Sequence, residues 1–107
     1  MSRFAEVLTR LTGVINSRSQ DDASGSYTAK LLTNPVLAAK KLGEEAIEAV
    51  IAATQGDSPA LVAESADLIY HWLVVLSAAG VSLDDVAAEL EAREGLSGLD
   101  EKASRPK

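Results

Sequence analysis

The sequence predicts an all-α fold, a helical bundle of four main helices plus one short helix. Apolar residues recur at helical spacing along most of the chain, and start signals and glycine stops divide them into segments. No segment shows the regular alternation of polar and apolar residues that indicates a half-buried strand. With 107 residues, 47% of them hydrophobic, the chain is long enough for one domain with a modest core.

The first predicted helix is amphipathic and is followed by a polar loop. Its apolar positions follow helical spacing, and they are Phe4, Val7, Leu8, Leu11, Val14 and Ile15. Residues 16–26 are polar and contain a glycine, which predicts a loop. We expect a short helix over residues 27–32.

The second predicted helix has clear signals at both ends. Asn34 is the expected N-cap, and Pro35 occupies the first helical position, where its missing N–H group costs nothing. We expect this helix to run to about Gln55 and to stop at Gly56.

Two further helices complete the predicted bundle. The Ser-Pro pair at 58–59 predicts the start of a third long helix that ends near Gly80. Ser82 is the expected cap of a fourth, with Asp85 as a weaker form of the capping box, and this helix ends near Arg93. We therefore expect one domain over residues 1–94 and a flexible C-terminal tail over residues 95–107.

The composition excludes several classes of function. No cysteine and one histidine leave no disulfide, no thiolate zinc site and no multi-histidine metal site. A net charge of −6 argues against nucleic-acid binding. Residues 1–18 are charged and lack the apolar segment of a signal peptide, so we expect a cytoplasmic protein. Charged residues interrupt the longest apolar run, 61–79, so we expect no membrane partner.

Three glutamates share one face of the second predicted helix. On a helical wheel Glu44, Glu45 and Glu48 fall within an arc of about 100°. A solvated face accounts for such a cluster taken alone. In that interpretation Lys40 and Lys41 are salt-bridge partners of the glutamates, at i,i+3 and i,i+4.

The third predicted helix makes a metal site more plausible. It is apolar nearly all round, which predicts burial on most sides, yet Glu64, Asp67 and His71 form one stripe on it. Glu45 with Glu48 and Glu64 with Asp67 are both i,i+3 pairs, and two antiparallel helices would bring them face to face. Four carboxylates without a soft ligand suit Mg²⁺, or Mn²⁺. The alternative is a partly exposed helix edge with ordinary salt bridges.

Several segments carry a family resemblance. "EEAIE", then fifteen residues, then "ESAD" resembles the EExxE…ExxD signature of the all-α MazG-like nucleotide pyrophosphohydrolases. Within that superfamily the chain is similar to the phosphoribosyl-ATP pyrophosphohydrolases, in the segments "GSYTAKLL", "KKLGEEAIEAVIAA", "ADLIYHWLVVL" and "VSLDDVAAELEAR". These segments cover most of the chain.

The resemblance implies an enzyme with a metal-dependent reaction. It hydrolyses phosphoribosyl-ATP to phosphoribosyl-AMP and pyrophosphate in the second step of histidine biosynthesis, with Mg²⁺. Glu45, Glu48, Glu64 and Asp67 are then the expected metal ligands, since cations reconcile an anionic substrate with an acidic site. Glu44, beside them, either accepts a proton from the attacking water or supports the ligands from behind. Glu44, Glu45 and Glu48 are thus the expected catalytic residues.

Other residues are candidates for contact with the substrate. Lysines and hydroxyl groups are expected to contact its phosphates or ribose, and these are Lys40, Lys41, Lys30, Ser26, Tyr27 and Thr28. For the hydroxyl residues the structural alternative is strong, with Ser26 as a helix cap and Tyr27 as a core anchor. We expect His71 to hydrogen-bond behind the metal ligands and not to bind the ion.

The apolar third helix also predicts self-association. So few other helices cannot cover it, so we expect a homodimer with this helix near the interface. The nearest alternative function is a MazG-like hydrolase of ordinary or damaged nucleoside triphosphates. A di-iron carboxylate bundle, which needs two Glu-x-x-His motifs, and a helical interaction module without chemistry are the others.

Overall fold

The computed structural model describes residues 2–20 and 25–95. Within these residues every regular element is helical, and no strand occurs. The elements are α1 (Arg3–Ser17), the short 3₁₀ helix η1 (Arg18–Gln20), α2 (Tyr27–Leu32), α3 (Pro35–Thr54), α4 (Ser58–Ala79) and α5 (Leu83–Ala92). The predicted all-α class, with four main helices and one short helix, is confirmed.

Side-chain caps explain where the helices begin. Asn34 caps α3, because its Oδ1 accepts a hydrogen bond from the Leu37 N–H at 3.2 Å, as predicted. The predicted cap of α4 is wrong by one residue. Asp57, not Ser58, caps this helix, and its Oδ1 accepts from the Ala60 N–H at 3.0 Å.

At α5 the capping box is complete. Ser82 Oγ accepts from the Asp85 N–H, and the Asp85 carboxylate accepts from the Ser82 N–H, both at 3.1 Å. The reciprocal pair satisfies two backbone donors that a helix start otherwise leaves unpaired. The predicted box is therefore stronger than the sequence suggested.

The helix ends differ from prediction only after α1. Helical structure continues through Ser17 and η1, so the first part of the predicted loop is helical. The middle of that loop, residues 21–24, lies outside the described residues. Gly56 and Gly80 follow α3 and α4 with φ of 68° and 71°, the left-handed conformation that glycine adopts without strain.

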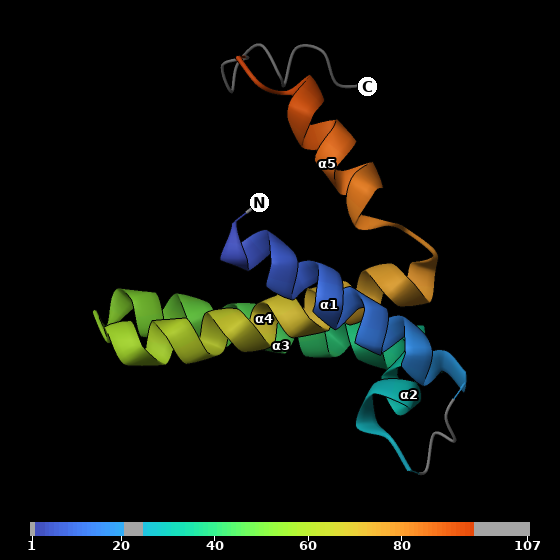
Figure 1. Ribbon diagram of the computed structural model, residues 1–107. Helices are drawn as coiled ribbons and strands as arrows, with labels where there is room; N and C mark the ends of the chain where they lie inside the picture. Colours follow the sequence, from blue (N-terminus) through green and yellow to red (C-terminus); the bar gives the residue numbers. More distant parts are fainter. Residues whose placement is uncertain (1, 21–24, 96–107) are drawn as a thin grey trace, which may run out of the picture.

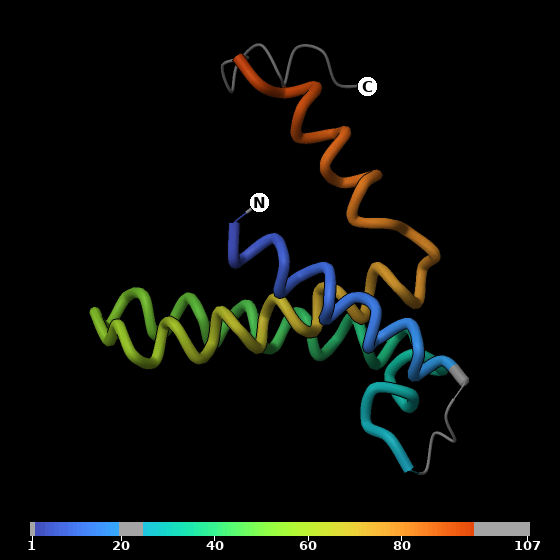
Figure 2. Tube along the Cα trace, viewed as in Figure 1, coloured from blue at the N-terminus to red at the C-terminus, as the bar shows by residue number. Residues whose placement is uncertain are grey.

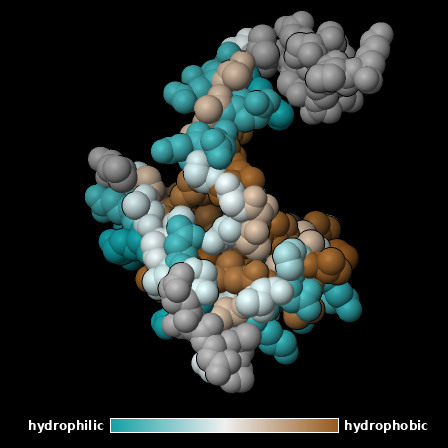
Figure 3. All heavy atoms as spheres, turned by 90° about the vertical axis from the view of Figure 1, so that its right-hand side faces the viewer, coloured by the Kyte–Doolittle hydropathy of each residue, from teal (hydrophilic) through white to brown (hydrophobic). Residues whose placement is uncertain are grey.

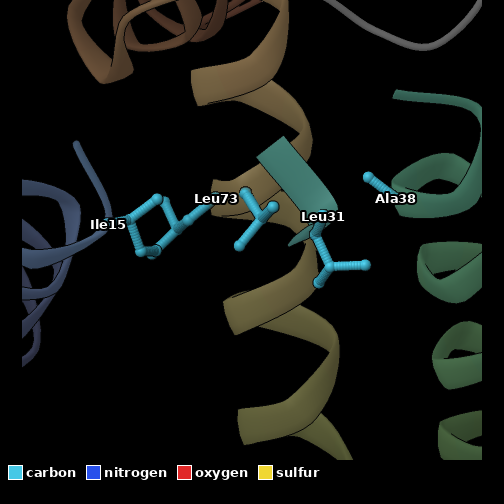
Figure 4. Packing of buried hydrophobic residues seen from close by; sticks show 5 residues of the cluster. Ile15, Leu31, Ala38 and Leu73 are labelled. Atoms are coloured by element: carbon cyan, nitrogen blue, oxygen red, sulfur yellow. The ribbon is translucent and has the colours of Figure 1, made fainter. Parts of the chain in front are cut away.

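Helices α3 and α4 form a long antiparallel hairpin, and α1 and α2 pack against one end of it (Figures 1 and 2). The core lies at that end, and Figure 4 shows side chains from four helices meeting there. Its buried members are Ile15 from α1, Leu31 from α2, Ala38 from α3, and Leu73 and Val74 from α4.

Much of the hairpin remains uncovered in a single chain. The expectation that α4 is buried on most sides is wrong for the described chain, because its buried residues, His71, Leu73 and Val74, all lie in its second half. At the other end of the hairpin Ile47 is 63% exposed and Val62 is 71% exposed. α5 has no buried residue and projects away from the other helices (Figure 1). Apart from Gly95, the predicted tail lies outside the described residues.

By length and composition, α4 is apolar enough to cross a membrane. The central helix of a folded protein passes the same test. In this chain α4 lies against α3 and carries Glu64 and Asp67. The absence of a membrane partner stays a prediction.

Candidate active site

Three carboxylates meet where α3 lies against α4. One oxygen each of Glu45 and Glu48, from α3, and of Glu64, from α4, all lie within 4.8 Å of one another. The short turn between the two helices makes them antiparallel, which is what brings the two acidic faces together. We call Glu45, Glu48 and Glu64 the carboxylate cluster.

The carboxylate cluster carries more negative charge than its surroundings balance. Glu45 and Glu64 are half-buried, and Oε2 of each is buried without a hydrogen-bond partner. In the described part of the chain no lysine or arginine forms an ion pair with the cluster. Buried acceptors that lack a partner are costly, so a bound cation fits this arrangement.

The electrostatics of the cluster show the same imbalance. Desolvation, followed by the negative charge of Glu48, raises the pKa of Glu45 above its usual range. A hydrogen bond with the Glu48 carboxyl, followed by desolvation, raises the pKa of Glu64. Two carboxyls share a hydrogen bond only when one is protonated. The cluster therefore favours either a proton or a metal ion.

Asp67 lies beside the carboxylate cluster but not within it. Its side chain is exposed, and the structure does not bring it into the group of three. Its negative charge nevertheless contributes to the raised pKa of both Glu45 and Glu64, so it lies near them. Its backbone carbonyl oxygen accepts a hydrogen bond from Nδ1 of His71 at 2.7 Å.

Glu44 and Lys41 pair with each other at the edge of the cluster. Lys41 Nζ lies 3.3 Å from Glu44 Oε2, both side chains are partly exposed, and this hydrogen bond raises the pKa of Lys41. The i,i+3 salt bridge considered for the lysines is thus present. Lys40 and Lys30 are exposed on α3 and α2.

The three predicted hydroxyl residues have different partners. Ser26 Oγ caps α2 and accepts from the Ala29 N–H at 3.1 Å. The Thr28 hydroxyl hydrogen-bonds to the Tyr70 hydroxyl. The Tyr27 hydroxyl lies 3.2 Å from Nε2 of His71. Tyr27 is half-exposed and its pKa is raised, mainly by desolvation, with smaller effects of Lys41, Glu45 and Glu44.

Sequence reasoning missed the links between α2 and α4. Tyr70 was expected only in a core or interface, but its hydroxyl binds Thr28, 42 residues away in sequence. Tyr27 and His71 are 44 residues apart, and their rings meet edge to face at 6.1 Å between centroids. No local pattern signals contacts over such separations, because they depend on how α2 docks on α4.

Comparison with known proteins gives one consistent result. Residues 8–94 match the family model described as phosphoribosyl-ATP pyrophosphohydrolase. A phosphoribosyl-ATP pyrophosphatase of Caulobacter vibrioides is 64% identical over 103 residues, which is 96% of each chain. Proteins with the same name from Caulobacter sp. and Parvibaculum lavamentivorans are 61% and 58% identical, over 99% and 98% of this chain.

Proposed function

This chain belongs to the phosphoribosyl-ATP pyrophosphohydrolase family, and we propose that its carboxylate cluster is the metal-binding centre of the family's reaction. The protein is an enzyme that hydrolyses phosphoribosyl-ATP to phosphoribosyl-AMP and pyrophosphate, in histidine biosynthesis. In this reaction a water oxygen forms a bond to the α-phosphorus, and the bond from that phosphorus to the bridging oxygen breaks. Pyrophosphate leaves.

The observation that carries the metal proposal is the pair of unpartnered buried oxygens on Glu45 and Glu64. They lie in a cluster of three carboxylates within 4.8 Å, where a polyphosphate would be repelled without a cation. Oxygen-only ligands suit Mg²⁺ first and Mn²⁺ second. When bound, the ion supplies charge neutralisation and polarises the phosphoryl oxygens.

The residues divide the work by position. Glu45, Glu48 and Glu64 hold the cation, with Asp67, one turn beyond Glu64 on α4, as the fourth ligand. Glu44 lies outside the cluster and is held by Lys41. We assign Glu44 the role of accepting the proton of the attacking water.

Lysines supply the contacts to the substrate's phosphates. Lys41 sits beside the cluster through its pair with Glu44, so its ammonium group is the best placed. Lys40 and Lys30, both exposed, are further candidates. Ammonium groups at these positions would bind phosphate oxygens as point charges.

Product analysis tests the proposed function. The purified protein, given phosphoribosyl-ATP and Mg²⁺, should form pyrophosphate and phosphoribosyl-AMP in equal amounts, and EDTA should stop the reaction. ATP and dCTP serve as parallel substrates. Release of orthophosphate, or faster turnover of either simple triphosphate, would contradict it.

A homodimer is the second part of the proposal. Large apolar side chains at the hairpin tip are exposed, namely Ile47, Val50, Ile51, Leu61 and Val62. The underside of α5 faces an apolar groove lined by Leu8, Trp72, Leu83, Val86 and Leu90, and Figure 3 shows hydrophobic side chains at the surface beneath this helix. Surfaces of this kind are unusual on a monomer. A second copy of the chain would cover them. A cytoplasmic location and the absence of nucleic-acid partners stay predictions.

A further inference from the structure

His71 is the buried polar side chain of the described residues, with 7% of its surface exposed. Both of its ring nitrogens are engaged. Nδ1 lies 2.7 Å from the Asp67 carbonyl oxygen, and Nε2 lies 3.2 Å from the Tyr27 hydroxyl oxygen. The first of these contacts fixes the direction of the second.

A carbonyl oxygen can only accept, so Nδ1 of His71 must carry the hydrogen. In the neutral imidazole Nε2 then has a lone pair and no hydrogen. The hydroxyl of Tyr27 is therefore the donor in its contact with Nε2. The backbone of α4 thus orients a side chain on α2 through the imidazole ring.

The Tyr27 oxygen has only acceptor capacity left once its hydrogen is used. Burial and neighbouring charges raise the pKa of the phenol, so it stays un-ionised at neutral pH. A neutral phenol oxygen without a free hydrogen cannot bind a phosphate oxygen, which also only accepts. It can bind a hydroxyl group or an N–H group of a ligand.

The position of Tyr27 selects among such ligand groups. Lys41, Glu44 and Glu45 all act on its ionisation, so the hydroxyl lies beside the carboxylate cluster. In a nucleotide the group next to the polyphosphate is the ribose, which carries hydroxyl donors. Ser26 and Thr28 are engaged as a helix cap and with Tyr70, so Tyr27 is the hydroxyl residue best placed for the ribose.

We propose that His71 holds the Tyr27 hydroxyl as a hydrogen-bond acceptor beside the carboxylate cluster, where it recognises a ribose hydroxyl of the substrate and not a phosphate oxygen. Tyr27 is then a specificity residue, and His71 is a positioning residue that acts through it. This inference rests on the proposed function, which supplies the ribose-containing substrate.

The test compares substrates that have or lack the hydroxyl. Phosphoribosyl-ATP and its 2′-deoxy and 3′-deoxy analogues, modified on the ribose that carries the phosphates, are given to wild type and Tyr27→Phe. Wild type should lose roughly three- to tenfold in kcat/KM with one analogue, as expected for one hydrogen bond. Tyr27→Phe should show a similar loss with the natural substrate and no further loss with that analogue.

Tyr70→Phe is the matched control, since it removes a neighbouring hydroxyl that binds Thr28. It should keep the discrimination against the analogue. His71→Leu should abolish the discrimination as Tyr27→Phe does, and the double variant should add nothing. His71→Gln, whose amide oxygen can again accept from Tyr27, should restore part of it, which a general loss of packing does not predict.

Inorganic pyrophosphate separates the two kinds of contact. Its inhibition constant should be the same in wild type and Tyr27→Phe. A weaker inhibition in Tyr27→Phe, or a wild type that does not distinguish either analogue from the natural substrate, would overturn the inference. If the protein does not hydrolyse phosphoribosyl-ATP, the proposed function fails separately. Calorimetric binding of ATP and its deoxy forms then decides whether Tyr27 recognises the ribose.

Discussion

Glu45 on α3 and Glu64 on α4 face each other across the helical hairpin, with carboxylate oxygens within 4.8 Å. Each has one buried oxygen without a hydrogen-bond partner, and the pKa of each carboxyl is raised. Two residues sixteen turns of sequence reasoning could only pair on paper thus share one acidic centre. The first two predictions concern this centre.

Replacing Glu45, Glu48 or Glu64 by glutamine should remove Mg²⁺ binding and turnover. The loss in kcat should be at least on the order of a hundredfold, because the charge stabilisation by a catalytic metal is worth several kcal/mol. Calorimetry with Mg²⁺ and steady-state kinetics measure the two effects. Asp67→Asn should behave alike if its exposed carboxylate completes the site.

Glu89→Gln is the control for this series, because Glu89 lies on α5 and pairs with Arg93 at 3.1 Å. It should bind Mg²⁺ normally. Normal activity in Asp67→Asn would remove Asp67 from the ligand set. Normal Mg²⁺ binding in all the cluster variants would contradict the metal centre itself.

Without metal, the stability of the protein should fall as the pH rises above the ordinary glutamate pKa of 4.5. The folded state raises the pKa of Glu45 and so binds its proton more tightly than the unfolded state does. Stability from this group is therefore complete below pH 4.5 and is lost as pH rises through the folded-state value. Thermal unfolding in EDTA across this range measures it.

Glu48→Gln should raise the unfolding midpoint in EDTA, because the charge of Glu48 contributes to both raised pKa values. Glu44→Gln should not, since it removes the favourable pair with Lys41. Saturating Mg²⁺ should stabilise wild type by about 2.7 kcal/mol at a hundredfold excess over Kd. A wild type that Mg²⁺ leaves unchanged, with a less stable Glu48→Gln, would indicate an ordinary acidic surface.

Glu44→Gln should separate proton transfer from metal binding. If Glu44 accepts the proton of the attacking water, kcat should fall by about 10²- to 10⁴-fold. The affinity for Mg²⁺ should change little, because Glu44 lies outside the carboxylate cluster. A nearly normal kcat, measured under saturating substrate, would assign the proton to another group.

Lys41→Ala should mainly affect substrate binding. A partly exposed charge contact is worth up to about 1 kcal/mol, so KM should rise by roughly three- to fivefold with a smaller change in kcat. Arg10→Ala, the same loss of charge on α1, should leave KM unchanged. An unaltered KM in Lys41→Ala would show that this lysine serves only its pair with Glu44.

Placing charges at the hairpin tip should dissociate the homodimer. Ile47→Glu combined with Val62→Glu would bury unpaired charges in the proposed interface, at a cost of several kcal/mol per ion. Sedimentation velocity should then show monomers. Val36→Glu, at the opposite end of α3 and 80% exposed, is the control and should stay dimeric. A wild type that sediments as a monomer at micromolar concentration would refute the homodimer.

The helices were largely predictable because their signals are local. Asn34 and Gly80 bound their helices as expected, since a cap or a left-handed glycine acts within one turn. The start of α4 moved to Asp57 because two adjacent residues can both cap, and the geometry chooses between them. The acidic faces of α3 and α4 were likewise readable from helical spacing.

By itself the sequence determined the helices, the apolar stripes and the position of each carboxylate on its helix face, because these depend on neighbours within four residues. Only the tertiary structure decided that Glu45, Glu48 and Glu64 converge while Asp67 stays outside, since side-chain distances across two helices depend on how those helices pack. The same holds for the bond from Tyr27 to His71, which forms only when α2 docks against α4.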